Sequence, residues 1–298
     1  MLLDIAVGDA FGAGFEGVDR KTIDDYFKRN RYLNYVRHPR HNITPGDYTD
    51  DTQMASVVAE AMLSGNFTRR DLADRWVKRF HQDKRLGYTS RFYNLLNHCR
   101  TGGDLLSRLS GSSGITSGAA MRAPVIGLYE RVSKVKKIAK MQAEITHGAS
   151  GVEAAIASAL MVHYFYRMRG QKAGLRNFIA KEVRKDYARP WQKGRKVGTE
   201  GWQCVSAAIQ AVMDNDNIPD LLRQCVRYGG DTDTVAAIAM AAASVSLEYR
   251  NQHDNHGNGW NKRFPVRLYS GLEPAKGLYG RNYLQQLDGR LFRKFSRN

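Results

Sequence analysis

Residues 229–247 read GGDTDTVAAIAMAAASVSL. Two glycines and an Asp-Thr-Asp-Thr cluster precede an alanine-rich apolar run of thirteen residues, from Val235 to Leu247. That run is too short to cross a bilayer, which takes about 20 residues. The stretch therefore predicts a buried helix over 231–249. Its small side chains would let neighbouring helices approach closely, as they do in a compact helical protein.

The rest of the chain shows the same helical pattern. Apolar residues recur at helical spacing over residues 52–63, 70–81, 151–168, 202–213 and 219–228. No sustained alternation of the kind that marks a strand is found. Glycine and polar residues predict loops over residues 8–19, 37–48, 101–118, 189–201 and 251–261, the last of which we expect to be mobile.

The length of 298 residues and the 42% hydrophobic content are sufficient for a packed core. We find no interdomain linker and no repeat. The sequence therefore predicts an all-α fold: a compact helical bundle with one domain over residues 1–298.

The net charge of +17 is concentrated in three segments. Residues 20–41 carry +5, residues 167–198 carry +9 and residues 262–298 carry +7, so the other 207 residues carry a net −4. Such basic segments are either solvated faces or a surface for an acidic partner such as a phosphate polymer. In 262–298 the cations alternate with aromatic residues, which suits nucleic-acid contact and equally suits aromatic anchors that pack this segment onto the core.

The three cysteines form no paired motif, which favours a reducing compartment. Asp4 interrupts the first apolar stretch, so we expect no signal peptide. These features predict a cytoplasmic protein without membrane contact, and we expect a monomer.

Two acidic clusters stand at the predicted starts of helices. They are Tyr48-Thr49-Asp50-Asp51-Thr52 and Gly229-Gly230-Asp231-Thr232-Asp233-Thr234. One interpretation is structural, because Asp and Thr are good N-caps and a carboxylate at a helix N-terminus gains about 0.3–1 kcal/mol from the dipole.

The second interpretation is a metal centre. Capping needs one side-chain oxygen per helix, whereas the clusters supply four carboxylates and four hydroxyls. Close packing of these carboxylates is unfavourable without a cation. Oxygen ligands favour Mg²⁺, Mn²⁺ or Ca²⁺ over zinc or copper. The residues alone leave both interpretations open.

Five motifs follow one another over about residues 1–250: GDAFG at 8–12 with Glu16, YTDDTQMA at 48–55, SGAAMRAPVIGLY at 117–129, Thr146-His147, and GGDTDTVAAIA at 229–239. In these motifs and in their order, the chain resembles the ADP-ribosylglycohydrolase family. The resemblance implies an all-helical enzyme that binds two Mg²⁺ or Mn²⁺ ions and cleaves ADP-ribose from its attachment point.

The resemblance also implies roles for individual residues. The implied metal ligands are Thr49, Asp50, Asp51, Asp231, Asp233 and Thr234. The candidates for proton transfer are Asp51, Asp233 and Glu16. Backbone N–H groups at Ser117, Gly118 and Ala119 would meet the diphosphate, as a turn into a helix start can, and His147 would face the ribose or phosphate.

Two departures from the family pattern matter. Ser117 stands where the family usually has Asn, and residues 251–298 form a basic C-terminal segment without a match.

The expected function is release of ADP-ribose from a modified macromolecule, foremost a protein with ADP-ribosyl-arginine and otherwise a nucleic acid. The alternatives are a non-catalytic module that binds ADP-ribose or nucleic acid, and a two-metal phosphoesterase. The sequence leaves the linkage open.

Other polar residues have plainer expectations. Seven histidines lack metal-ligand spacing and are expected to have surface or structural roles: His38, His41, His81, His98, His163, His253 and His256. For Arg122 the sequence leaves two roles open, a salt bridge to a carboxylate of the cleft or a contact with substrate.

Overall fold

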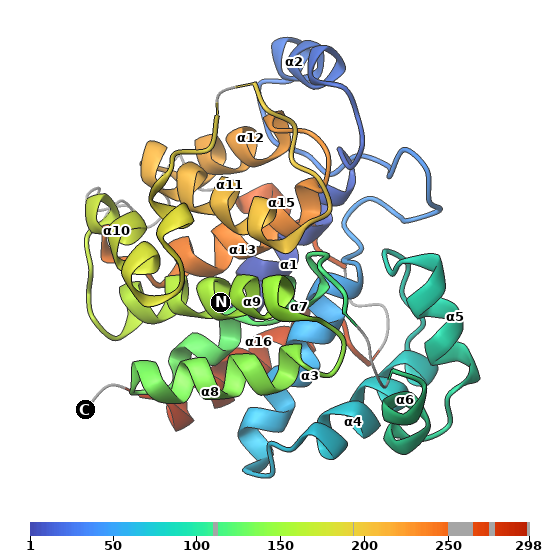
Figure 1. Ribbon diagram of the computed structural model, residues 1–298. Helices are drawn as coiled ribbons and strands as arrows, with labels where there is room; N and C mark the ends of the chain where they lie inside the picture. Colours follow the sequence, from blue (N-terminus) through green and yellow to red (C-terminus); the bar gives the residue numbers. More distant parts are fainter. Residues whose placement is uncertain (110–112, 193, 250–264, 274–277, 297–298) are drawn as a thin grey trace.

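Two buried helices, α1 (Leu2–Ala13) and α13 (Thr232–Val245), lie side by side at the centre of the protein (Figure 1). The structure is a computed structural model and describes residues 1–109, 113–192, 194–249, 265–273 and 278–296. Nearly every side chain of both helices is buried, so neither has a polar face. A helix that is apolar all round belongs in a core, as the alanine-rich stretch predicted.

Glycine makes the contact between these helices possible. A Cβ atom on Gly8 would lie 2.5 Å from the backbone oxygen of Ala236, and one on Gly12 would lie 2.5 Å from the Cα atom of Asp233. The predicted loop over 8–19 is therefore wrong in its first half. Its glycines serve close helix packing, which brings the Asp9 region of α1 against the start of α13.

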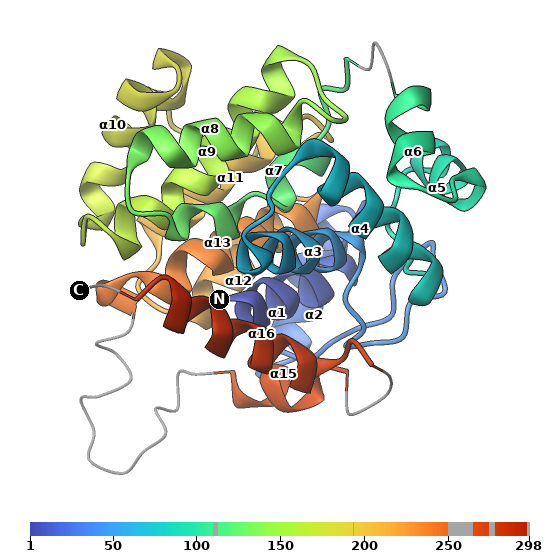
Figure 2. The ribbon, with the colours of Figure 1, turned by 90° about the horizontal axis from the view of Figure 1, so that it is seen from below.

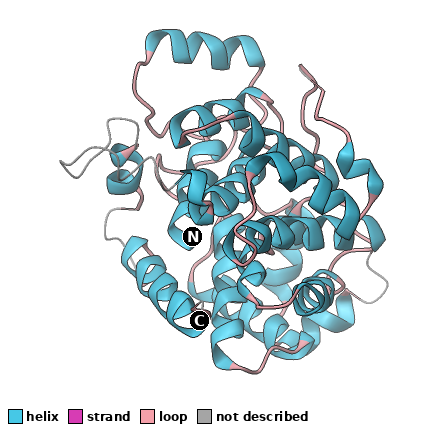
Figure 3. Ribbon diagram, turned by 90° about the vertical axis from the view of Figure 1, so that its left-hand side faces the viewer, coloured by secondary structure: helices cyan, strands magenta, loops and turns pink. Residues whose placement is uncertain are grey.

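The remaining helices surround this pair (Figures 1 and 3). Among the described residues, no strand is found, only isolated bridges. The all-α prediction is confirmed. The other elements are α2 (Arg20–Arg29), α3 (Asp50–Ser64), α4 (Arg69–Gln82), α5 (Ser90–His98), α6 (Gly102–Arg108), α7 (Gly118–Met121), η1 (Pro124–Leu128), α8 (Val132–Ala143), α9 (Ala149–Tyr166), α10 (Lys172–Glu182), η2 (Lys185–Ala188), α11 (Gly201–Asp214), α12 (Ile218–Arg227), α15 (Val266–Gly271) and α16 (Arg281–Lys294).

The predicted helices agree with α3, α4, α9, α11 and α12 to within two residues at each end. Two further details differ. The predicted loop over 101–118 contains α6, and the helix predicted over 231–249 is interrupted at Ser246, whose backbone is extended. Residues 251–261, predicted as a mobile loop, lie outside the described residues.

The C-terminal segment closes one side of the core. Helix α16 buries Leu284, Leu287 and Leu291 and packs against α1 and α3 (Figure 2). The Asp288 carboxylate accepts the backbone N–H of Leu2 at 2.8 Å, at the start of α1. The expected packing onto the core is therefore confirmed for α16, and a nucleic-acid contact of residues 262–298 stays a prediction.

None of the helices in the described part of the chain has both the length and the apolar character that a membrane span requires.

Candidate metal centre

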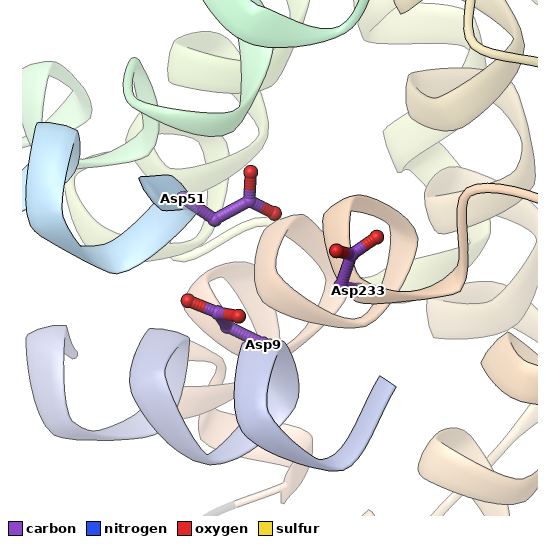
Figure 4. A group of neighbouring side chains, drawn as sticks. All are labelled: Asp9, Asp51 and Asp233. Carbon is purple, nitrogen blue, oxygen red and sulfur yellow. The ribbon is translucent and has the colours of Figure 1, made fainter. Parts of the chain in front are cut away.

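Three buried carboxylates face one another where three helices meet (Figure 4). Asp9 lies in α1, Asp51 in the first turn of α3 and Asp233 in the first turn of α13. One oxygen from each lies within 4.8 Å of the other two. The fold thus brings together the two acidic clusters, which are about 180 residues apart in the sequence.

Asp9 is the member of this group to which sequence reasoning gave no role, although it lies in the GDAFG motif. It is fully buried and accepts hydrogen bonds from the start of α3. Thr49 donates its backbone N–H and its hydroxyl, and Thr52 donates its N–H at 3.0 Å and its hydroxyl at 2.6 Å. Burial raises the pKa of Asp9, and these hydrogen bonds oppose the rise.

Capping does not account for the acidic side chains. The hydroxyl of Thr49 caps α3 by accepting the Asp51 N–H. Asp231 occupies the N-cap position of α13 but makes no capping hydrogen bond with its side chain. The carboxylates of Asp50, Asp51 and Asp231 are therefore not used as helix caps.

The site is electrostatically unfavourable on its own. Burial, followed by the charge of Asp9, raises the pKa of Asp50 and Asp51 well above the ordinary range. Burial, followed by the charges of Asp231 and Asp51, does the same for Asp233. Carboxylates that repel one another in a dry site need either protons or a cation.

One oxygen atom of Asp51 favours a cation over protons. Asp51 Oδ2 is buried and accepts no hydrogen bond from any described residue, whereas Asp51 Oδ1 receives only a long contact from the Thr234 hydroxyl, 3.4 Å away. A buried unpartnered carboxylate oxygen costs about 1–3 kcal/mol or more. The oxygen-only donor set fits a hard divalent cation, so the aspartates can hold a metal ion.

The remaining candidate ligands lie at the edges of this group. Asp231 Oδ2 accepts the hydroxyl of Ser117 at 2.7 Å and the thiol of Cys204 at 3.4 Å. The Asp50 carboxylate lies against the backbone of Gly87. Thr232, the middle residue of Asp-Thr-Asp, points away and donates its hydroxyl to the Gly12 carbonyl at 2.8 Å.

Glu16 lies apart from the three aspartates, in the turn after α1. Its two oxygens are held by His38 at 2.8 Å and by Arg40 at 2.6 Å. Burial alone would raise the pKa of Glu16, but the His38 hydrogen bond and the Arg40 charge outweigh it and lower the pKa. The pKa of Glu16 is therefore shifted in the opposite direction to the pKa values of Asp50, Asp51 and Asp233.

The residues predicted to contact substrate form a second group. The N–H of Ser117 donates to the Thr199 carbonyl at 2.8 Å, so this amide is already engaged. Gly118, at the start of α7, lies beside the ring of His147: a Cβ atom there would be 3.4 Å from Cε1. Burial and the charge of Arg122 lower the pKa of His147 to about 3, so the imidazole is neutral.

Among the described residues, Arg122 does not form the first of its two expected contacts, a salt bridge to a carboxylate, and a contact with substrate stays a prediction. It is buried, donates to Gln142 and to the Thr146 hydroxyl, and lies 4.3 Å from the centre of the Trp76 ring. Within the described part of the chain it makes no salt bridge to a carboxylate. Burial lowers its pKa to about 9. Arg122 therefore supports the Thr146-His147 turn from inside the core.

The helical fold and the carboxylate cluster define the class of the protein: an all-α protein whose core helices present a candidate metal centre. The ADP-ribosylglycohydrolase family model matches residues 1–251. The chain belongs to this family, and it is a glycohydrolase.

Curated relatives agree. The chain is 25% identical to ADP-ribosylhydrolase ARH3 of Xenopus tropicalis, over 82% of this chain and 85% of the relative. It is 31% identical to human ARH3 over 53% of this chain and 46% of that protein. It is 25% identical to the ADP-ribosyl-[dinitrogen reductase] glycohydrolase of Rhodospirillum rubrum, over 89% of each.

The fold is also similar to a solved structure. A chain described as "ADP-ribosylglycohydrolase-related protein complex" superposes with a TM-score of 0.73 at 25% identity. The match covers 98% of this chain and 95% of that one. The similarity therefore extends into the C-terminal segment, beyond the residues that the family model matches.

Proposed function

We propose that this glycohydrolase releases ADP-ribose from a modified macromolecule and depends on two Mg²⁺ or Mn²⁺ ions held between the starts of α3 and α13. The buried, unpartnered Oδ2 atom of Asp51, a residue grouped with Asp9 and Asp233, carries this proposal. A bound cation would satisfy that oxygen and offset the repulsion between the carboxylates.

Six side chains would hold the ions. Thr49, Asp50 and Asp51 approach from α3, and Asp231, Asp233 and Thr234 approach from α13. When bound, such ions orient the hydroxyls of the distal ribose and lower the pKa of water. Asp9 supports this arrangement by fixing Thr49 and Thr52.

The proton chemistry falls to a carboxylate near the proposed ions. Asp51 and Asp233 are candidates, but both would be engaged as ligands. Glu16 is not one of the six proposed ligands, and it lies in the turn whose next residue, Gly17, donates its N–H to the Gly230 carbonyl at 3.0 Å. Glu16 is therefore our first candidate for accepting a proton.

The diphosphate side would use residues 117–119 and His147. Because the Ser117 amide is engaged and its hydroxyl holds Asp231, we assign the phosphate contacts to the amides of Gly118 and Ala119. His147 adds a neutral hydrogen-bonding ring next to Gly118.

The basic segments would recruit the acidic macromolecule that carries ADP-ribose. Residues 20–41 and 167–198 both reach the rim of the site. Lys196 is exposed, and its Cγ atom would lie 3.4 Å from a Cβ atom on Gly230. Residues 262–298 add further charge. One relative's name specifies a modified protein, dinitrogen reductase, which supports a protein substrate. The first linkage to test is ADP-ribosyl-arginine.

The three cysteines are unpaired and buried, which supports a reducing, cytoplasmic compartment. We propose that the enzyme acts there as a monomer.

The test is a panel of ADP-ribosylated arginine protein, serine peptide, DNA and RNA, incubated with Mg²⁺, Mn²⁺ or EDTA. Mass spectrometry should find intact ADP-ribose released only with metal. Asp231→Asn should abolish release without unfolding, whereas Asp216→Asn, at a side chain 80% exposed, should not. Affinity without turnover would indicate a binding module, and AMP or ribose phosphate would indicate a phosphoesterase.

A further inference from the structure

Glu16 is held by a single loop. Residues 30–49, which connect α2 to α3, contain no helix, and they supply both partners of the Glu16 carboxylate. His38 Nε2 lies 2.8 Å from Oε2, and Arg40 Nη2 lies 2.6 Å from Oε1. Each oxygen therefore has its own donor.

The backbone fixes the tautomer of His38. The N–H groups of Arg40 and His41 both donate to His38 Nδ1, each at 3.0 Å. A backbone N–H can only donate, so Nδ1 must present its lone pair and the ring proton must lie on Nε2. His38 therefore donates its Nε2–H to Glu16.

The two partners of Glu16 differ in how firmly they are placed. The Arg40 side chain is 61% exposed, so solvent screens its ion pair and its geometry is loosely defined. The His38 side chain is 1% exposed, and its ring packs 4.7 Å from the ring of His41. The orientation of the Glu16 carboxylate therefore depends mainly on His38.

Glu16 is close enough to matter to the metal centre. Its charge contributes to the raised pKa values of Asp50 and Asp233. Gly17 next to it is hydrogen-bonded to Gly230, at the entrance to α13. A change in the charge of Glu16 therefore acts electrostatically on two of the proposed ligands.

We propose that His38 is a positioning residue: it sets the orientation of the Glu16 carboxylate through its Nε2–H, and it does so because the amides of Arg40 and His41 lock its ring. This inference rests on the proposed function for its kinetic consequence, although the locked tautomer can be tested without turnover.

Two isosteric variants separate positioning from support of the loop. His38→Gln places an amide N–H near the Nε2 position but loses the acceptor at Nδ1. His38→Asn keeps an acceptor near Nδ1 but cannot reach Glu16. If His38 acts through Glu16, His38→Asn should lower kcat about tenfold or more with little change in KM, and His38→Gln, which keeps the donor but loses the lock, should lower kcat less. The reverse order would overturn the proposal.

A double-mutant cycle strengthens the test. Glu16→Gln combined with His38→Asn should be no slower than Glu16→Gln alone, because the action of His38 passes through Glu16. Additive losses would contradict this. His98→Asn serves as the histidine control, since His98 is exposed in α5 and its ring contacts the Asn94 carbonyl, and it should leave kcat unchanged.

The tautomer is measured on the wild-type protein, independently of activity. Nitrogen NMR of ¹⁵N-histidine-labelled protein should show one ring, absent in His38→Gln, with its proton on Nε2. A ring protonated on Nδ1 would overturn the proposal even in an active enzyme. The expected tautomer in a protein that releases no ADP-ribose would instead show that the proposed function had failed.

Discussion

Thr49 donates its hydroxyl to the Asp9 carboxylate at 2.8 Å, and its backbone N–H lies 3.0 Å from the same carboxylate. A residue in the middle of α1 thus fixes the residue that precedes Asp50 and Asp51. The glycines on either side of Asp9, Gly8 and Gly12, bring α1 against α13. The same short stretch of α1 therefore positions both acidic clusters.

Asp9→Asn should destabilise the metal-free protein. An amide has one acceptor oxygen, and its NH₂ group would face the N–H donors of Thr49 and Thr52, so we expect a loss of about 2 kcal/mol in the free energy of unfolding. Thr52→Val removes only one hydroxyl donor and should cost about 1 kcal/mol. Urea denaturation in EDTA measures both. A smaller loss for Asp9→Asn than for Thr52→Val would contradict this role of Asp9.

Asp51→Asn, unlike Asp9→Asn, should not destabilise the metal-free protein. Asp51 has an unpartnered oxygen and lies among carboxylates, so neutralising it should leave the stability in EDTA unchanged or increase it. A metal that binds only the folded state raises the midpoint of thermal unfolding. That increase with Mn²⁺ should appear in the wild type and in Asp216→Asn and be absent in Asp51→Asn. A retained increase would show that the ion binds elsewhere.

The stability of the metal-free protein should fall as pH rises. Burial and like charges raise the pKa values of Asp50, Asp51 and Asp233 above the unfolded value of about 4. Their contribution is fully present below that unfolded value and is lost as pH rises through the folded pKa values. Between about pH 5 and pH 8 in EDTA, the wild type should therefore lose stability relative to Asp51→Asn. Saturating Mn²⁺ should reduce this loss, since it favours the ionised carboxylates.

The helices of the core could be predicted because the apolar pattern of their own side chains indicates a buried helix. The alanine-rich apolar runs that became α9, α11 and α13 bury most of their positions. Gly8 and Gly12 could not be interpreted in this way. Glycine in a sequence indicates a loop as readily as a close contact. The contact forms only when the chain folds and α13 packs against α1, because Gly8 and Ala236 are 228 residues apart and Gly12 and Asp233 are 221 apart.

The candidate site could be predicted where its acidic residues stand close together in the sequence. Asp50, Asp51 and Asp233 stand in such clusters, whereas Asp9 is a lone acid in an apolar stretch. The role of His38 depends on two backbone amides and a carboxylate 22 residues away, which no spacing rule reveals. Asp9 could have been found from the GDAFG motif; for His38 the sequence holds no comparable signal.

Gly87→Ala should disturb the site from outside it. Gly87 has a φ of +114°, and a Cβ atom there would overlap Asp50 Oδ1 at 2.1 Å and approach Thr49 Cβ at 2.8 Å. Either the loop or the Asp50 carboxylate must move, so we expect kcat to fall about tenfold or more, because small displacements in a catalytic site have large effects. Gly65→Ala is the control: Gly65 also has a positive φ, of +80°, but its Cβ would meet nothing within 4 Å. It should lose about 1 kcal/mol of stability and keep its activity.

Lys196→Glu should weaken recruitment of the macromolecular substrate without changing the chemistry. Lys196 is exposed at the rim beside Gly230, at the end of a segment with a net charge of +9. Reversing a rim charge mainly changes long-range attraction. We expect KM for an ADP-ribosylated protein to rise several-fold at low salt and kcat to stay constant. The rise in KM should be smaller in about 0.15 M salt, where the screening length is about 8 Å.

Free ADP-ribosyl-arginine should be hydrolysed as by the wild type. Lys137→Glu, an exposed charge on α8, is the control. An equal rise in KM from both reversals would mean that net charge, rather than the rim beside Gly230, attracts the substrate.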